Sequence, residues 1–80
     1  MSGKFFAIKS ELNGLYLDVS EGAMEEDQRV ITWEWHGGDN QMWFADPENY
    51  VIRSKQDEDF VLDLDDGELH VAFHPSIQLN

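Results

Sequence analysis

Hydrophobic and polar residues alternate in short runs along the chain, and Gly, Asn, Asp or Pro residues stand between the runs. Such alternation is typical of β-strands with one buried face, whereas apolar residues at helical spacing are scarce. The one competing helical segment, 22–28, has an apolar pair too short for more than a turn. We expect eight strands, at 5–9, 15–19, 29–35, 41–45, 50–54, 60–64, 69–73 and 77–79. One short strand in about ten residues indicates an all-β barrel or sandwich.

An internal repeat organises these strands. The segment FAIKS at 6–10 matches YVIRS at 50–54, and LDV at 17–19 matches LDL at 62–64. The second copy is shorter, and of the closing triplet QMW at 41–43 it retains only the glutamine, in QLN at 78–80. The sequence therefore predicts a single domain, 1–80, made of two four-stranded repeats at about 5–45 and 50–80, the second of them degenerate.

The first repeat contains FAIKS, NGLYLDV and VITWEW in this order and closes on GGDNQMW. With these motifs it resembles one subdomain of the ricin B-type β-trefoil lectins, whose repeats close on Gln-x-Trp. The resemblance is good over 5–45 and poor over 50–80. It implies a β-trefoil-like fold, in which two-stranded hairpins form a threefold barrel with shallow sugar sites on its sides.

Two repeats do not close such a barrel, because they leave an open strand edge and part of the core uncovered. We therefore expect closure by self-association, as a homo-oligomer, or by a third repeat that is missing here. Association also helps a small domain, since a chain of this mass buries only about 60% of the surface that it exposes when unfolded.

The resemblance assigns a sugar site to the first repeat. It implies Asp18 as the carboxylate, Trp33 as the aromatic platform, and Asn40 with Gln41 as the polar pair before the closing Trp43. The chemistry of a sugar favours the same groups. Its vicinal hydroxyls both donate and accept hydrogen bonds, which suits a carboxylate and an amide, and its patch of C–H groups packs on a flat aromatic ring. Where some relatives carry Gln two residues before the platform, this chain has Ile31. That substitution leaves the sugar's identity open.

Two neighbouring residues join the candidate site. Trp35 lies two positions after Trp33, so an extended strand places both on one face, and a core this small cannot bury them both. An exposed Trp indicates a contact surface. His36 follows in the adjacent loop. We expect Trp43, in contrast, to be a core residue.

Each candidate also has a purely structural interpretation. Asp18 is suited to cap the turn that follows it, and Asn40 is suited to the turn after Gly37-Gly38-Asp39. In the second repeat Asp63 keeps the position of Asp18, and His70, Phe73 or His74 are the substitutes for the platform. No Asn-Gln pair remains there, so we expect this second site not to bind.

The net charge of −12, from 17 acidic and 5 basic residues, disfavours nucleic acids and anionic membranes as partners. No apolar stretch has the length of a signal peptide or a membrane span, so we expect no membrane insertion. The absence of cysteine excludes disulfides and fits a cytoplasmic protein.

Signatures of catalysis and of cofactor binding are absent from the sequence. It has no Cys nucleophile, no His-x-His or His-Glu-x-x-His metal set and no Gly-rich phosphate loop, so we expect no enzyme, no cofactor and no metal. The acidic stretch around Gly67 fails the EF-hand spacing, although an irregular calcium site of Asp63, Asp65, Asp66 and Glu68 stays open. The prediction is a non-catalytic lectin for galactose or N-acetylgalactosamine-type glycans. The alternative is a β-trefoil-like protein-interaction module that uses the exposed Trp face.

Overall fold

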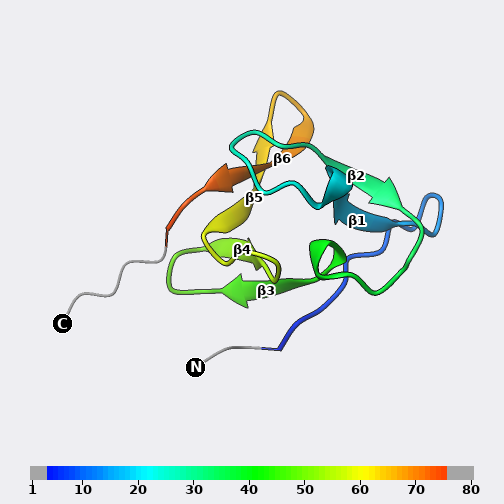
Figure 1. Ribbon diagram of the computed structural model, residues 1–80, viewed down its shortest axis with the longest axis horizontal. Coiled ribbons are helices and arrows are strands. Elements are labelled where there is room, and N and C mark those ends of the chain that lie inside the picture. Colours follow the sequence, from blue (N-terminus) through cyan, green and yellow to red (C-terminus); the bar gives the residue numbers. More distant parts are fainter. Residues whose placement is uncertain (1–3, 76–80) are drawn as a thin grey trace.

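In the computed structural model, which describes residues 4–75, the strands form two antiparallel sheets (Figure 1). One sheet pairs β1 (Tyr16–Val19) with β2 (Val30–Trp33). The other is a meander of four strands, β3 (Trp43–Asp46), β4 (Val51–Ser54), β5 (Phe60–Asp65) and β6 (Glu68–Phe73). Two single-turn 3-10 helices, η1 (Ser20–Gly22) and η2 (Asp39–Gln41), follow β1 and precede β3. The all-β prediction is confirmed.

Turn residues fix the register of the hairpins. Asp66 and Gly67 both have positive φ, 52° and 77°, between the paired residues Asp65 and Glu68. Two left-handed residues in a two-residue loop are the signature of a turn whose twist matches that of the strands. The β5–β6 register follows from it and runs from Asp65 opposite Glu68 to Phe60 opposite Phe73.

The core lies between the two sheets. Its buried residues come from five different strands: Val19, Val30, Trp43, Phe60 and Val71. Partly buried apolar side chains pack around them: Phe6, Ile8, Leu17, Met24, Ile52, Leu62 and Leu69. Trp43 has no exposed surface, so the expectation that it is a core residue is confirmed.

Backbone hydrogen bonds join the sheets across this core. Val71 of β6 donates its N–H to the carbonyl oxygen of Gln28 at 2.8 Å and accepts from the N–H of Asp27 at 3.0 Å. The segment just before β2 is thereby held against the edge of the four-stranded sheet, which fixes the β1–β2 hairpin relative to the rest of the domain.

The expected strand at 5–9 is wrong. The backbone groups of Phe6 exchange hydrogen bonds with Trp43 at 2.8 and 2.9 Å, whereas Lys9 bridges to Tyr16 on another hairpin. Because the segment changes partners within four residues, it forms isolated bridges and no continuous ladder. The predicted strand at 29–35 ends at Trp33, and the strand predicted at 77–79 lies outside the described residues.

A buried arginine ties β4 to the loops around it. The Arg53 side chain is 2% exposed, and its Nε donates to Asp46 Oδ2 at 2.7 Å. Its Nη1 donates to the carbonyl oxygens of Glu58, at 2.9 Å, and His74, at 2.7 Å. Hydrogen bonds from Asn49 and from Arg53 lower the pKa of Asp46, so this acceptor stays ionised.

Within residues 4–75 no helix is long and apolar enough to cross a membrane.

Candidate functional site

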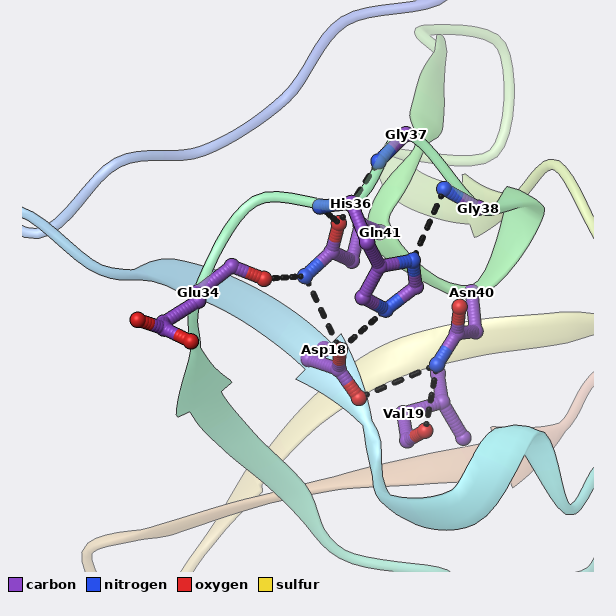
Figure 2. Close-up of polar contacts among 8 residues, drawn as sticks. All are labelled: Asp18, Val19, Glu34, His36, Gly37, Gly38, Asn40 and Gln41. Atoms are coloured by element: carbon purple, nitrogen blue, oxygen red, sulfur yellow. Dashed lines mark hydrogen bonds and ion pairs between the residues drawn. The ribbon is translucent and has the colours of Figure 1, made fainter.

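Residues far apart in the sequence meet at the end of β1. Asp18, the third residue of that strand, is 3% exposed, and its carboxylate receives side-chain hydrogen bonds from η2 (Figure 2). Asn40 Nδ2 donates to Asp18 Oδ1 at 3.0 Å, and Gln41 Nε2 donates to Asp18 Oδ2 at 3.0 Å. The structure thus brings together three of the residues that the sequence singled out.

Gln41 is completely buried and uses every hydrogen-bonding position of its amide. Nε2 donates to Asp18 and to the carbonyl oxygen of Glu34, the latter at 2.7 Å. Oε1 accepts the backbone N–H groups of His36 at 2.9 Å and Gly37 at 3.3 Å. A primary amide has two donor hydrogens and two acceptor lone pairs, so none is left for a ligand. The assignment of Gln41 as a direct sugar contact is therefore replaced: it positions Asp18 and the loop at 34–37.

The predicted strand at 41–45 is shortened by the same arrangement. Gln41 donates its backbone N–H to the carbonyl oxygen of Gly38 at 3.0 Å and so ends a helical turn, and the strand begins only at Trp43.

Asn40 lies in that turn, as its structural interpretation proposed, yet its side chain also reaches β1. Nδ2 donates to Asp18 and to the carbonyl oxygen of Val19 at 3.1 Å, so both amide hydrogens are used and Oδ1 remains as an acceptor.

His36 covers the other side of the carboxylate. Its Nδ1 accepts the N–H of Gly38 at 3.1 Å, which in the neutral ring leaves the hydrogen on Nε2. Nε2 lies 3.4 Å from Asp18 Oδ2. The ring is 46% exposed, so it forms part of the surface while it contacts the buried carboxylate beneath.

A recess of about 350 Å³ opens above this cluster. Its walls come from β1, η1, β2 and the loop before β3: Asp18, Ser20, Glu21, Ile31, Trp33, His36 and Asn40. The Trp33 side chain is 55% exposed and supplies a large apolar wall. A recess of this composition offers oxygen acceptors at its base, an apolar ring at its side and an imidazole at its rim.

Trp35 does not line the recess. It is 48% exposed, and its ring lies on Tyr16 with the centroids 5.1 Å apart. Because β2 ends at Trp33, the strand alternation that would place both tryptophans on one face does not extend to Trp35. Sequence reasoning missed Ser20 and Glu21 as recess residues, since neither belongs to a motif that the resemblance assigns to the site.

The second repeat, as far as the structure describes it (to residue 75), lacks the matching arrangement. Asp63 is exposed and stands opposite His70, as Asp18 stands opposite Ile31. The platform residue Trp33 lies two positions after Ile31. The equivalent position in the second repeat, two after His70, holds Ala72. Phe73 instead packs edge-to-face on Phe60, with ring centroids 5.6 Å apart, so it does not stand at the platform position.

The acidic residues of the β5–β6 hairpin do not converge. Among the described residues, 4–75, no group of three or more His, Asp or Glu side chains is placed to hold a metal ion. The irregular calcium site around Gly67 therefore finds no support in the arrangement of these side chains.

A model of the family described as ricin-type β-trefoil lectin domain-like matches residues 1–79. The chain belongs to this family. Mucoricin from Rhizopus delemar is 38% identical over 55 residues, which cover 66% of this chain and 37% of that protein. The chain thus spans well under half of this relative's length.

Solved structures agree with the family. A mutant of the earthworm lectin C-terminal domain, in complex with 6'-sialyllactose, superposes with a TM-score of 0.73 at 36% identity, over 98% of this chain and 59% of that one. The earthworm R-type lectin C-half, in complex with GalNAc, has a TM-score of 0.62 at 26% identity, over 94% of this chain and 91% of that one.

The designed threefold-symmetric protein ThreeFoil shares the fold, with a TM-score of 0.71 at 21% identity over 91% of this chain and 56% of that one. The fold is therefore β-trefoil-like, as the resemblance implied. Membership of a lectin family supports carbohydrate binding without catalysis.

Proposed function

We propose that this chain is a non-catalytic lectin that binds galactose or N-acetylgalactosamine-type glycans in the recess above Asp18. The observation that carries the proposal is the meeting of a fixed carboxylate, a free amide oxygen and an exposed indole around one hollow. A hexose has the complementary surface, since adjacent hydroxyls donate hydrogen bonds and one face of the ring is made of C–H groups.

The existing hydrogen bonds leave particular groups of the cluster available to a sugar. Hydrogen bonds from Asn40 and Gln41 occupy two of the about four lone-pair positions of the Asp18 carboxylate, and His36 Nε2 lies 3.4 Å from Oδ2, so the carboxylate can still accept a sugar hydroxyl. Asn40 Oδ1 accepts a second hydroxyl. The apolar face of the sugar then lies on Trp33, and no atom of the cluster has to move to provide these groups.

A ligand titration followed by tryptophan fluorescence tests the proposal. Because Trp33 forms a wall of the recess, galactose or lactose should change its emission in a saturable way, with a dissociation constant in the millimolar range, about −4 kcal/mol. Mannose serves as the stereochemical control. An unchanged signal up to roughly 100 mM galactose, where such a site is nearly saturated, contradicts the proposal.

Gly38 is expected to be required for the shape of the recess. A Cβ built on it would lie 2.6 Å from His36 Cε1 and 2.8 Å from Asn40 Oδ1, although its own φ of −75° suits any residue. Gly38→Ala should therefore displace both side chains and weaken galactose binding roughly tenfold, with the fold retained.

Gly67→Ala is the matched control for that substitution. Nothing lies within 4 Å of its Cβ position, but its φ is +77°. It should lower the free energy of unfolding without changing the affinity for galactose. Equal affinities of the Gly38→Ala variant and the parent protein would show that the close approach at Gly38 does not shape the site.

Association of several chains and a cytoplasmic location belong to the same proposal. A shallow sugar site binds weakly by itself, and presentation of several sites at once raises the avidity for a glycan-bearing surface. Closure of the barrel by a further copy or by a third repeat in a longer chain would supply such sites.

A further inference from the structure

Glu21 contributes an unengaged carboxylate to the wall of the recess. It follows β1 in η1, it is exposed, and within residues 4–75 no hydrogen bond or ion pair holds its carboxylate. Asp18 at the base of the recess differs, because Asn40 and Gln41 donate hydrogen bonds to its two carboxylate oxygens and His36 Nε2 lies 3.4 Å from Oδ2. The two acids of the recess therefore offer different chemistry to a ligand.

The backbone at Glu21 is strained. Its φ of 59° and ψ of 11° lie in the left-handed region, which favours glycine, and the next residue, Gly22, has a φ of 64°. Glycine at position 21 would relieve the strain at no steric cost. Asp27, Tyr50 and Asp66 also have a positive φ, so the strain by itself assigns no function to Glu21. The turn holds the backbone of Glu21 directly after β1, at the wall of the recess.

The charge of the recess has one sign. Its lining contains two acids, one imidazole and no Lys or Arg. The nearby cation Lys55 is engaged by Asp39, with 3.3 Å between Nζ and Oδ1. The whole chain carries −12, which adds to a negative potential at the mouth.

We propose that Glu21 makes the recess select hexoses that carry a free ammonium group over neutral hexoses, and reject hexoses that carry a carboxylate. This inference rests on the proposed function and names the ligand class of the same site. An ammonium group on a sugar seated against Trp33 pairs with the unengaged Glu21 carboxylate, whereas an acidic sugar meets two negative charges at once.

Calorimetric titrations with galactosamine, galactose, N-acetylgalactosamine and galacturonate, at neutral pH and low salt, test the inference. An exposed ion pair changes affinity modestly, so galactosamine should bind about threefold more tightly than galactose, and galacturonate about threefold more weakly. The differences should shrink at several hundred millimolar salt, because the ions screen exposed charges. N-acetylgalactosamine, which has no charge, should show no dependence on salt.

Two variants assign the effect to its residue. Glu21→Gln keeps the shape of the side chain but removes its charge, so this variant should bind galactosamine and galactose with equal affinity. Glu48→Gln removes an equal charge in the exposed β3–β4 turn, outside the recess, and should leave the preference intact. Glu21→Lys should reverse the order and favour galacturonate.

The outcomes separate this inference from the function on which it rests. Equal binding of galactosamine and galactose by the parent protein, or an unchanged preference in Glu21→Gln, overturns the role of Glu21 and leaves the lectin proposal standing. Absence of binding by all four sugars overturns both. A preference that persists at high salt, or that Glu48→Gln removes equally, contradicts a pair formed at Glu21.

Discussion

Replacement of Asp18 by alanine is expected to weaken galactose binding by roughly ten- to a hundredfold, which takes a millimolar site to the limit of measurement. The substitution removes the one buried acceptor at the base of the recess and the anchor of Asn40 and His36. A hydrogen bond to a charged group contributes about 1.5–3 kcal/mol, and each 1.4 kcal/mol changes affinity tenfold. Fluorescence or calorimetric titration with galactose measures the loss.

Asp63→Ala is the matched control for this prediction, because Asp63 is exposed and faces no indole. It should leave galactose affinity unchanged. Asp18→Ala also leaves the buried amide of Gln41 short of one acceptor, which lowers the free energy of unfolding by about 1–3 kcal/mol, so circular dichroism must show that the variant is folded. Undiminished galactose binding by the folded variant would refute the assignment of the site.

The same variant separates the lectin from the protein-interaction module. An aromatic surface that docks a partner would involve Trp33, Trp35 and Tyr16. These residues are only partly buried, and none of them is hydrogen-bonded to Asp18. Binding to such a surface depends mainly on apolar contact, so Asp18→Ala should leave it nearly intact. Loss of sugar binding with Asp18→Ala, together with a normal fold, favours the lectin.

Trp43→Ala should lower the free energy of unfolding by about 3–5 kcal/mol. Trp43 has no exposed surface, contributes to the core between the two sheets and holds Phe6 through paired backbone hydrogen bonds. An 80-residue domain has a total stability of roughly 4–12 kcal/mol, so this loss is a large share of it. Urea denaturation followed by far-UV circular dichroism gives the difference.

Trp35→Ala tests whether the size of the lost side chain alone explains that effect. Trp35 is half exposed and its ring contacts Tyr16, so its removal should cost about 1 kcal/mol. Similar losses for the two variants would mean that burial does not distinguish them, and the description of the core around Trp43 would be wrong.

Much of the fold could be predicted because β-strands and turns have local signatures. Alternation located the strands around Asp18, Trp33 and Arg53, and also the two strands predicted at 60–64 and 69–73. The strand predicted at 5–9 was wrong. The segment has the alternation of a strand, but its hydrogen bonds go to two separate hairpins. Partner choice is a tertiary property, and alternation along one segment does not encode it.

The site was predicted less completely, and the reasons are geometric. Asp18, Asn40 and Gln41 meet as the resemblance implied, but the sequence does not reveal that the amide of Gln41 makes four hydrogen bonds and has no exposed surface. Glu21 was missed because nothing in an acidic chain distinguishes one glutamate from the others. Its left-handed backbone is not visible in the sequence.

The alanine at position 72 has a consequence for what a single molecule can hold. Since it stands in the second hairpin where the first has an indole, the described part of the chain presents one recess of this kind instead of two. Under the proposed function, this part of the chain would bind one glycan and would not bridge two. Agglutination by this protein would then depend on how many chains associate, and not on the affinity of each recess for its sugar.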